Sequence, residues 1–463
     1  MKMKMIPVKF GSETVELRLP DQTGVFSMPK PKPLLNPART IEEALVNSVA
    51  TPGLAEIAAE KLKNKPESKA VVVISDNTRP VPYRGEAGIL WPVLEKLLNQ
   101  GFKKENILVL VANGTHRLLS EDELHRMLDE RIFEQKITVL NHNCKDQGNL
   151  VFLGETSRGS KVYINRLYVE ADLKILTGLV ESHFMAGASG GRKSVCPGLI
   201  GEESTYIFHG APILSSPEAR DLVLDGNPCH EEAVEVAKIA GVDYIVNVTL
   251  DHQFKVTGVF AGELEAAHRQ AVEKIKEYVA IPLEQEYDIV VTHAGFVGIN
   301  HYQAAKAGVV SIPALKPGGR LIMGASTTDL DPIGSPMYRT VLHLLKMVGV
   351  ERFMQLLLSP DWVFIPEQWQ VQMWARLFSK IPQENLVYYS PQISANDYRF
   401  LPGIDGNQFL PESKRYRGSI QDIPTVIEKA VHEGVTALKK VGKEEISIAY
   451  LTDGPYAVPV LKG

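Results

Sequence analysis

The stretch from Glu181 to Ser194 combines small residues with chemically active side chains in one predicted loop. It reads Glu-Ser-His-Phe-Met-Ala-Gly-Ala-Ser-Gly-Gly-Arg-Lys-Ser. His183, Arg192 and Lys193 supply titratable or positive groups, and the small residues at 189–191 would let backbone N–H groups approach an anion closely. The residue types predict a functional site here rather than a packed segment.

A phosphate loop is the first interpretation to test, because residues 187–194 nearly fit G-x-x-x-x-G-K-[ST]. Arg192 stands where the pattern requires a glycine. No G-x-G-x-x-G follows a predicted strand. A nucleotide-dependent oxidoreductase or phosphotransferase is therefore the weaker alternative, which tight binding of ATP or NAD would support. A non-catalytic cofactor-binding protein is the other alternative.

Other polar groups directly follow apolar runs in the first half of the chain. The run at 70–74 leads into residues 76–79, and the run at 107–112 leads into a loop with His116. His209 lies near the end of a short predicted helix. Because the carboxyl ends of parallel strands meet at one edge of a sheet, these side chains are expected beside Lys193.

The elements that must position these residues alternate between strand and helix. Continuous apolar runs such as 70–74, 107–112 and 173–180 are typical of buried parallel strands, and amphipathic helical segments separate them. A second series begins with the strand 288–293. We predict an α/β protein with two Rossmann-like α/β domains and a cofactor and substrate cleft between them.

The chain of 463 residues is too long for one core. We predict an N-terminal domain over 1–280, which includes a hairpin at 8–19, and a C-terminal domain over 281–463. Poor periodicity over about 350–417 suggests an irregular insertion of helices and loops. The last strand, 446–451, either closes the second domain or packs back on the first.

Composition limits the partners. The formal net charge of −5 gives no reason to expect nucleic acid or an anionic membrane surface, so a small-molecule ligand is expected. No apolar run approaches the roughly 18 residues of a membrane span. The start lacks the apolar core of a signal peptide, and three scattered cysteines suit a reducing compartment, so we expect a cytoplasmic protein. An oligomer is compatible with these features.

In the second domain, Tyr302 and Lys306 are spaced i,i+4 at the start of a predicted helix. Exposed N–H groups and the helix dipole favour an anion at such a position. This helix start is a second candidate site.

The ordered set of motifs resembles the nickel-dependent lactate racemase family. The resemblance covers roughly residues 8–345, and the whole set is far more specific than any single motif. The matching residues are Asp76-Asn77-Thr78-Arg79-Pro80, Gly114-Thr115-His116-Arg117, Glu181-Ser182-His183, Ser189-Gly190-Gly191-Arg192-Lys193, His209, and Tyr302-Gln303 with Lys306.

The resemblance implies a nickel pincer nucleotide, a pyridinium mononucleotide with sulfur arms, joined to Lys193 through a thioamide. It implies that His209 completes the nickel coordination and that His116 and His183 are the proton donor and acceptor. Asp76, Asn77, Thr78, Arg79 and Pro197 are then expected to bind the cofactor, and Arg79, Tyr302, Gln303 and Lys306 to contact the substrate.

The implied activity is racemisation or epimerisation of a 2-hydroxy acid by reversible hydride transfer. The α-hydrogen beside an ionised carboxylate is a very weak acid, whereas an electrophilic pyridinium can take it as hydride while a histidine takes the hydroxyl proton. Nickel suits imidazole and sulfur ligands, and a cationic side chain can hold the carboxylate. The sequence leaves the side chain of the acid open.

Overall fold

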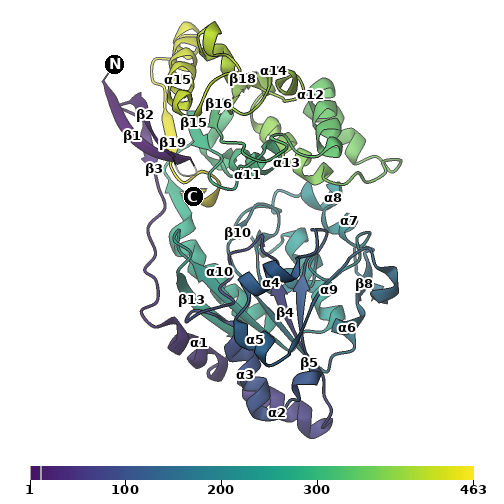
Figure 1. Ribbon diagram of the computed structural model, residues 1–463. Helices are drawn as coiled ribbons and strands as arrows, with labels where there is room; N and C mark the ends of the chain where they lie inside the picture. Colours follow the sequence, from purple (N-terminus) through teal and green to yellow (C-terminus); the bar gives the residue numbers. More distant parts are fainter. Residues whose placement is uncertain (1, 11–12, 463) are drawn as a thin grey trace. The chain divides into compact units, whose positions relative to one another are not determined.

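The computed structural model describes residues 2–10 and 13–462, which form two compact units (Figure 1). The central unit comprises Lys30–Tyr278, and the split unit comprises Met1–Pro29 with Val279–Gly463. Both are α/β, as predicted. The predicted domain 1–280 differs from the central unit at its first 29 residues, because these pair and pack with strands and helices of the split unit.

The central unit is built on a six-stranded sheet with Rossmann strand order. Five neighbouring strands are parallel, and β13 joins antiparallel at one edge. Numbered along the chain, the parallel strands lie in the order 5-4-1-2-3, so the direction of winding changes between β4 and β9. In spatial order the sheet consists of β13 (Val256–Gly262), β12 (Tyr244–Leu250), β9 (Leu173–Leu179), β4 (Ala70–Ser75), β5 (Ile107–Ala112) and β6 (Thr138–Asn141).

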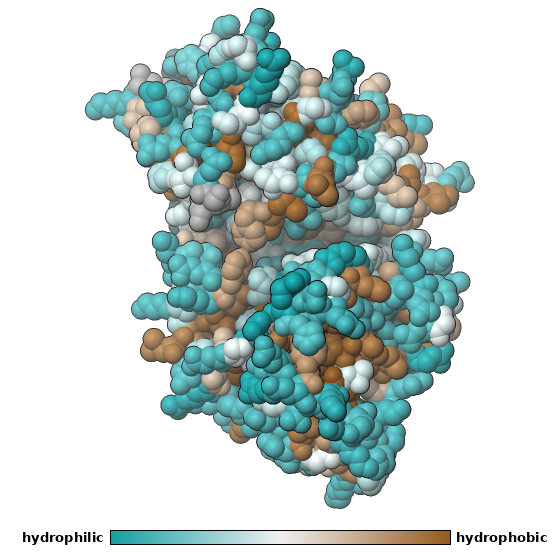
Figure 2. Space-filling model, in the orientation of Figure 1, coloured by the Kyte–Doolittle hydropathy of each residue, from teal (hydrophilic) through white to brown (hydrophobic). Residues whose placement is uncertain are grey.

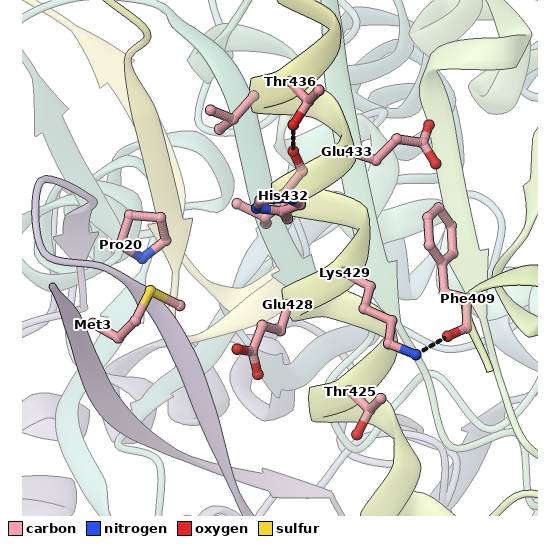
Figure 3. A pocket seen from close by; sticks show the side chains of 11 residues that line it. Met3, Pro20, Phe409, Thr425, Glu428, Lys429, His432, Glu433 and Thr436 are labelled. Atoms are coloured by element: carbon pink, nitrogen blue, oxygen red, sulfur yellow. Dashed lines mark hydrogen bonds between the residues drawn. The ribbon is translucent and has the colours of Figure 1, made fainter. Parts of the chain in front are cut away.

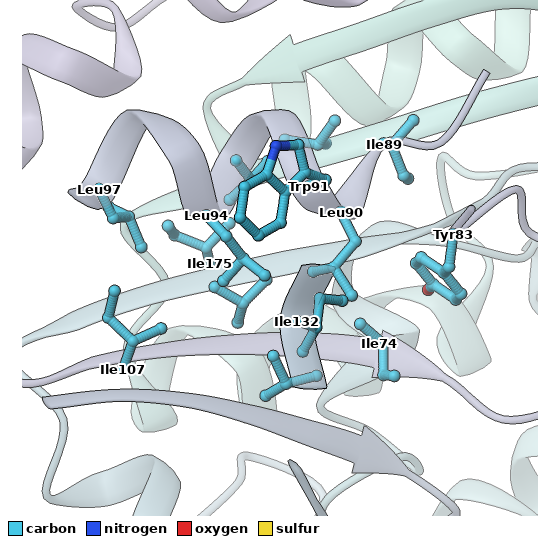
Figure 4. Packing of buried hydrophobic residues seen from close by; sticks show 14 of the residues in the cluster. Ile74, Tyr83, Ile89, Leu90, Trp91, Leu94, Leu97, Ile107, Ile132 and Ile175 are labelled. Carbon is cyan, nitrogen blue, oxygen red and sulfur yellow. The ribbon is translucent and has the colours of Figure 1, made fainter. Parts of the chain in front are cut away.

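Apolar side chains of α1 to α5 pack against strands of this sheet, and Figure 4 shows part of this cluster. Trp91 and Leu94 of α3 lie among Ile74, Ile107 and Ile175 from the strands. Truncating Leu94 to alanine would cost about 2–5 kcal/mol because the cavity could not fully close. The helices of the central unit are α1 (Pro37–Val46), α2 (Leu54–Asn64), α3 (Leu90–Gln100), α4 (Glu121–Met127), α5 (Glu130–Glu134), α6 (Arg166–Val169), α7 (Thr205–Phe208), α8 (Ala211–Leu214), α9 (Pro228–Ala240) and α10 (Leu264–Val279).

Two short antiparallel pairs complete the strands of the central unit. They are β7 (Leu150–Glu155) with β8 (Lys161–Asn165), and β10 (Ser182–His183) with β11 (Gly187–Ala188). The second pair lies within the loop that follows β9.

The split unit contains a second six-stranded sheet, and all of its strands are parallel. Residues 350–417 are not a mere insertion of helices and loops, since β17 and β18 extend this sheet. Both strands are too short to show a period. In spatial order the strands are β18 (Ile404–Asp405), β17 (Leu386–Tyr389), β16 (Leu315–Gly324), β15 (Tyr287–His293), β19 (Ile448–Leu451) and β3 (Gly24–Phe26).

The end of the chain also belongs to the split unit. β19 pairs with β15, and β20 (Val458–Leu461) pairs with β14 (Ala280–Leu283). β19 lies between β15 and β3, so it closes the second sheet and also pairs with residues that the prediction assigned to the first domain. The helices are α11 (His301–Val310), α12 (Pro336–Leu357), α13 (Gln368–Lys380), α14 (Ala395–Tyr398) and α15 (Ile423–Lys440).

The predicted N-terminal hairpin is confirmed as β1 (Met3–Phe10) and β2 (Glu13–Pro20). Its expected turn at 11–12 lies outside the described residues. Alternating side chains such as Phe10 and Leu17 are buried against α15 and the sheet of the split unit. This apolar face explains why the hairpin packs with residues far along the sequence.

Figure 2 shows hydrophilic residues over most of the viewed face, with smaller hydrophobic groups among them. Of the helices that the structure describes, none has the length and apolar character needed to cross a membrane.

Candidate active site

The predicted site residues of the central unit follow the carboxyl ends of three neighbouring strands. Asp76 comes directly after β4, His116 lies in the loop after β5, and His183 lies in the loop after β9. The change of winding between β4 and β9 opens a crevice at this edge in α/β sheets. The three loops therefore start from the position where such sheets bind ligands.

Asp76 and His116 form a close pair. Oδ2 of Asp76 lies 2.7 Å from Nδ1 of His116, and Oδ1 accepts from the backbone N–H and hydroxyl of Thr78 at 3.1 and 2.5 Å. Burial favours the neutral acid, but the hydrogen bonds from His116 and Thr78 outweigh it and lower the pKa of Asp76. The ionised carboxylate keeps a proton on Nδ1, which leaves the Nε2 lone pair of His116 available as a base.

His183 and Lys193 form a second close pair, with Nε2 and Nζ 2.8 Å apart. Nδ1 of His183 accepts from the backbone N–H groups of Met185 and Ala186, both at 3.2 Å. The proton of the neutral ring is therefore on Nε2, where it can donate to the lysine nitrogen only if that amine is deprotonated. Burial, together with the positive charge of Arg79, lowers the pKa of Lys193 to about 7, which favours this form.

His209 follows α7 and is held as a neutral imidazole. Its backbone N–H donates to Thr205 O at 2.9 Å, and its ring meets Phe208 edge-on. Burial lowers the pKa of His209 to about 3, and the positive charges of Lys193 and His116 act in the same direction. These charge effects indicate that His209 shares its surroundings with both residues, and a neutral imidazole is the form that binds metals.

The turn that carries His116 contacts the segment after Lys193. The N–H of Gly114 donates to Gly198 O at 3.0 Å, and a Cβ on Gly114 would lie 3.3 Å from Pro197 O. Gly114 has φ of +56°, a conformation that glycine adopts without strain. Pro197 thus lies directly against the His116 turn, as expected for residues of one site.

Arg79 and Asn77 each have an acidic partner. A guanidinium nitrogen of Arg79 donates to Oε1 of Glu181, and both side chains are partly exposed. Nδ2 of Asn77 donates to Glu123 at 3.2 Å. The role of Glu181 as a partner of Arg79 was not predicted, although Glu181 opens the same sequence motif as His183.

Two expectations for the glycine-rich turn are wrong. The N–H of Ser189 donates to Glu181 O and that of Gly191 donates to Asn247 Oδ1, both at 2.9 Å, so these amides are not free to bind an anion. Gly190 is required by packing, since a Cβ there would lie 2.7 Å from Val180. Arg192 is only 1% exposed and points into the interior, so it supplies no positive surface for a phosphate.

The substrate residues predicted in the second domain lie on α11 of the split unit. The start of this helix is capped rather than open: Asn300 Oδ1 accepts from the N–H of Gln303, and the N–H of Tyr302 donates to Ile333 O. An anion site formed by these amides is therefore not supported. Oε1 of Gln303, in contrast, is buried without a hydrogen-bond partner among the described residues, which suits a contact with a ligand.

Tyr302 is held by residues of α13. Its hydroxyl accepts from Trp369 Nε1 at 3.0 Å, and its carbonyl accepts from Gln370 Nε2 at 2.7 Å. Burial raises the pKa of Tyr302, so the phenol stays neutral. Lys306 lies one turn further along α11.

Two known proteins with sequences similar to this chain are lactate racemases. A lactate racemase of Lactiplantibacillus plantarum is 34% identical over 345 residues, which cover 74% of this chain and 78% of that protein. A lactate racemase of Thermoanaerobacterium thermosaccharolyticum is 31% identical over 382 residues, covering 81% and 86%.

The chain belongs to the lactate racemase family. The lactate racemase N-terminal domain matches residues 10–221, a range that contains every predicted site residue of the central unit. Membership of the lactate racemase family confirms the predicted family and makes the chain an isomerase.

The fold agrees with that of a solved lactate racemase. The lactate racemase apoprotein from Thermoanaerobacterium thermosaccharolyticum superimposes with a TM-score of 0.80 at 25% identity, covering 99% of this chain and all of that one. A Thermotoga maritima protein shares the fold, with a TM-score of 0.60 at 18% identity over 88% of this chain and 97% of that one. The α/β class predicted from alternating strands and helices is confirmed.

A surface pocket of the split unit lies between α15 and the β1–β2 hairpin (Figure 3). Lys429 Nζ there donates to Phe409 O at 2.9 Å. None of the residues that match the lactate racemase motifs lines this pocket. Its lining includes Met3, Pro20, Phe409, Glu428, Lys429 and His432.

Proposed function

We propose that this member of the lactate racemase family racemises or epimerises a 2-hydroxy acid by reversible hydride transfer, with a nickel pincer nucleotide attached to Lys193. The observation that carries the proposal is the 2.8 Å contact between Nε2 of His183 and the buried Nζ of Lys193, an amine whose pKa burial lowers to about 7. Burial also lowers the pKa of His209, so this ring is a neutral imidazole. Lactate is the first substrate to test, because both similar proteins described above are named lactate racemases.

The donor set fits this cofactor. A lysine attacks a carbonyl or thiocarbonyl carbon only as the free amine, and the surroundings of Lys193 favour that form near neutral pH. His209 offers an imidazole nitrogen to nickel. The described residues contain no group of three or more His, Cys, Asp or Glu side chains that could hold a metal, so the sulfur arms of the nucleotide would supply further donors. When bound, the nucleotide supplies an electrophilic ring that accepts hydride.

The two histidines act as acid/base residues for the hydroxyl proton of the substrate. With Nδ1 bound to Asp76, His116 presents the Nε2 lone pair and can accept the proton as hydride leaves the α-carbon. His183 has the same role for the other enantiomer of the substrate. Once Lys193 carries an amide-type bond, its nitrogen is no longer an acceptor, and Nε2 of His183 is released for a substrate oxygen.

The carboxylate of the acid needs a cationic partner that prevents the planar keto intermediate from leaving. Arg79 can offer two N–H donors, although it shares its charge with Glu181. Tyr302, Gln303 and Lys306 remain the proposed substrate contacts of the split unit, with the unpartnered Gln303 Oε1 as the supporting observation.

Mass spectrometry and chiral separation test the proposal together. Protein produced in cells that make the cofactor should gain the nucleotide mass on Lys193 and contain nickel, and it should interconvert D- and L-lactate or another acid of a hydroxy-acid panel. Lys193→Ala should lose the adduct. His116→Ala and His183→Ala should abolish interconversion while nickel stays bound. An unmodified Lys193 in active wild-type protein would disprove the attachment, and retained activity in either histidine variant would disprove its role.

A further inference from the structure

Arg192 is a buried cation whose N–H groups donate to backbone carbonyls of the loop between His183 and Lys193. It is 1% exposed and forms no ion pair with a described carboxylate. Nη2 donates to Ala186 O at 2.7 Å, and Nη1 donates to Gly190 O at 3.3 Å. Desolvating a guanidinium is costly, so its burial on backbone carbonyls indicates a specific structural task.

Ala186 connects this guanidinium to His183. Its carbonyl accepts from Arg192, and its N–H donates to Nδ1 of His183 at 3.2 Å. The other N–H at Nδ1 comes from Met185, whose carbonyl accepts from Asn227 Nδ2 at 2.9 Å. Arg192 and Lys193 are consecutive residues. The contacts from Arg192 to Ala186, from Ala186 to His183 and from His183 to Lys193 therefore form a closed ring, in which the last contact is 2.8 Å long.

His268 of α10 holds the other side of the same turn. Its Nε2 lies 2.8 Å from both Arg192 Nη1 and Ser189 O, and the ring is 1% exposed. The nitrogen accepts from Arg192 or donates to Ser189 according to its tautomer, and either bond ties α10 to the turn. A Cβ on Gly191 would lie 3.0 Å from His268 Cδ2, so the ring packs directly on the backbone.

We infer that Arg192 and His268 are positioning residues, which hold the turn so that His183 keeps one tautomer and faces the Lys193 nitrogen. Lysine cannot replace Arg192, because only the planar guanidinium reaches two carbonyls and a ring nitrogen in fixed directions. The inference deepens the proposed function, since that function gives Lys193 and His183 their tasks, but the geometry holds for the chain without cofactor.

The test uses full-length protein without cofactor, labelled with ¹⁵N in the histidine rings. The signals of His183 are assigned as those lost in His183→Gln. Long-range ring correlation spectra distinguish a protonated from an unprotonated nitrogen. In the wild type, His183 should show a fixed tautomer with the proton on Nε2. Arg192→Lys and His268→Ala should replace this pattern by averaged signals, and His268→Gln, which retains a polar group near the Nε2 position, should restore much of it.

Tyr168→Phe is the matched control. It removes a buried hydrogen bond from the Tyr168 hydroxyl to Gly241 O in the same unit, away from the turn, and should leave the His183 pattern unchanged. If His183 keeps its fixed tautomer in both Arg192→Lys and His268→Ala, the inference is wrong. If Arg192→Lys does not fold, the two His268 variants still decide. An absent adduct on Lys193 would count against the proposed function but would leave this result unaffected.

Discussion

The carboxylate of Asp76 lies 2.7 Å from Nδ1 of His116 and is 4% exposed. This arrangement fixes the tautomer of His116 in the same way that a buried carboxylate orients the histidine of a hydrolytic triad. His183 accepts two backbone N–H groups at Nδ1. The two proposed acid/base residues are therefore oriented by opposite means, one by an acceptor and the other by donors.

Replacing Asp76 with Asn should reduce kcat by about 10²-fold or more, because an amide can orient His116 in the wrong tautomer. The rate is measured by chiral separation of the acid after timed incubation. Tyr168→Phe is the control, because it removes a buried hydrogen bond of the same unit outside the proposed site and should leave kcat unchanged. Equal activity of Asp76→Asn and wild type would refute this role.

Replacing Glu181 with Gln should lower the KM for the hydroxy acid by about fivefold, as expected if a partly exposed ion pair worth about 1 kcal/mol no longer competes for Arg79. The substitution leaves the backbone bonds between Glu181 and Ser189 in place. Arg79→Ala should raise KM. An unchanged KM in both variants would exclude Arg79 from carboxylate binding.

Lys193 should become reactive at unusually low pH. Because its pKa is lowered to about 7, half of the amine is deprotonated there, and the rate of acetylation at Lys193 should level off above about pH 8. Lys103, whose ion pair with Glu67 raises its pKa, is an internal reference that should react faster only in strongly alkaline solution. Site-resolved mass spectrometry gives both rates, and parallel pH profiles would contradict the expectation.

Asp288 should make the split unit sensitive to acid. Burial would raise its pKa, but bonds from Lys443, Ser447 and Lys316 outweigh burial and lower the pKa to about 2 from an ordinary 3.8. A depressed acid pKa stabilises the fold above the unfolded value, and the contribution is lost as pH falls from 3.8 towards 2. Asp288→Asn should thus cost roughly 2 kcal/mol at pH 7 and much less near pH 2.

Hydrogen exchange of split-unit amides can follow this loss. Ser447→Ala removes the hydroxyl that donates to Asp288 Oδ2 at 2.8 Å and accepts from the Asp288 N–H and Lys316 Nζ. Because it retains the carboxylate, the pH dependence should be smaller than for Asp288→Asn. A cost for Asp288→Asn that does not vary with pH would show that the charge contributes nothing.

The position of the proposed site residues at one edge of the central sheet follows from local sequence signals. Asp76, His116 and His183 each follow a continuous apolar run, and the carboxyl edge of a parallel sheet then brings their loops together. The direction of Arg192 could not be predicted, since an arginine beside glycines is ordinarily solvated. Its burial depends on His268, which lies on a helix much later in the chain.

The split unit was harder to predict for a related reason. β17 and β18 are too short for a detectable period, and β3 has only three residues. β19, which pairs with β3, lies near the other end of the sequence, so no local sequence pattern predicts this pairing. The hairpin itself and a helix at the position of α15 were predicted, but the packing of one against the other was not.

The pairing of β3 with β19 also affects how the chain folds during synthesis. The central unit is one continuous segment and can collapse as soon as residue 278 has left the ribosome. The hairpin made earlier must keep Phe10 and Leu17 without their packing partners until α15 and β19 have been translated. These apolar side chains are consequently the part of a nascent chain that a chaperone would need to shield for longest.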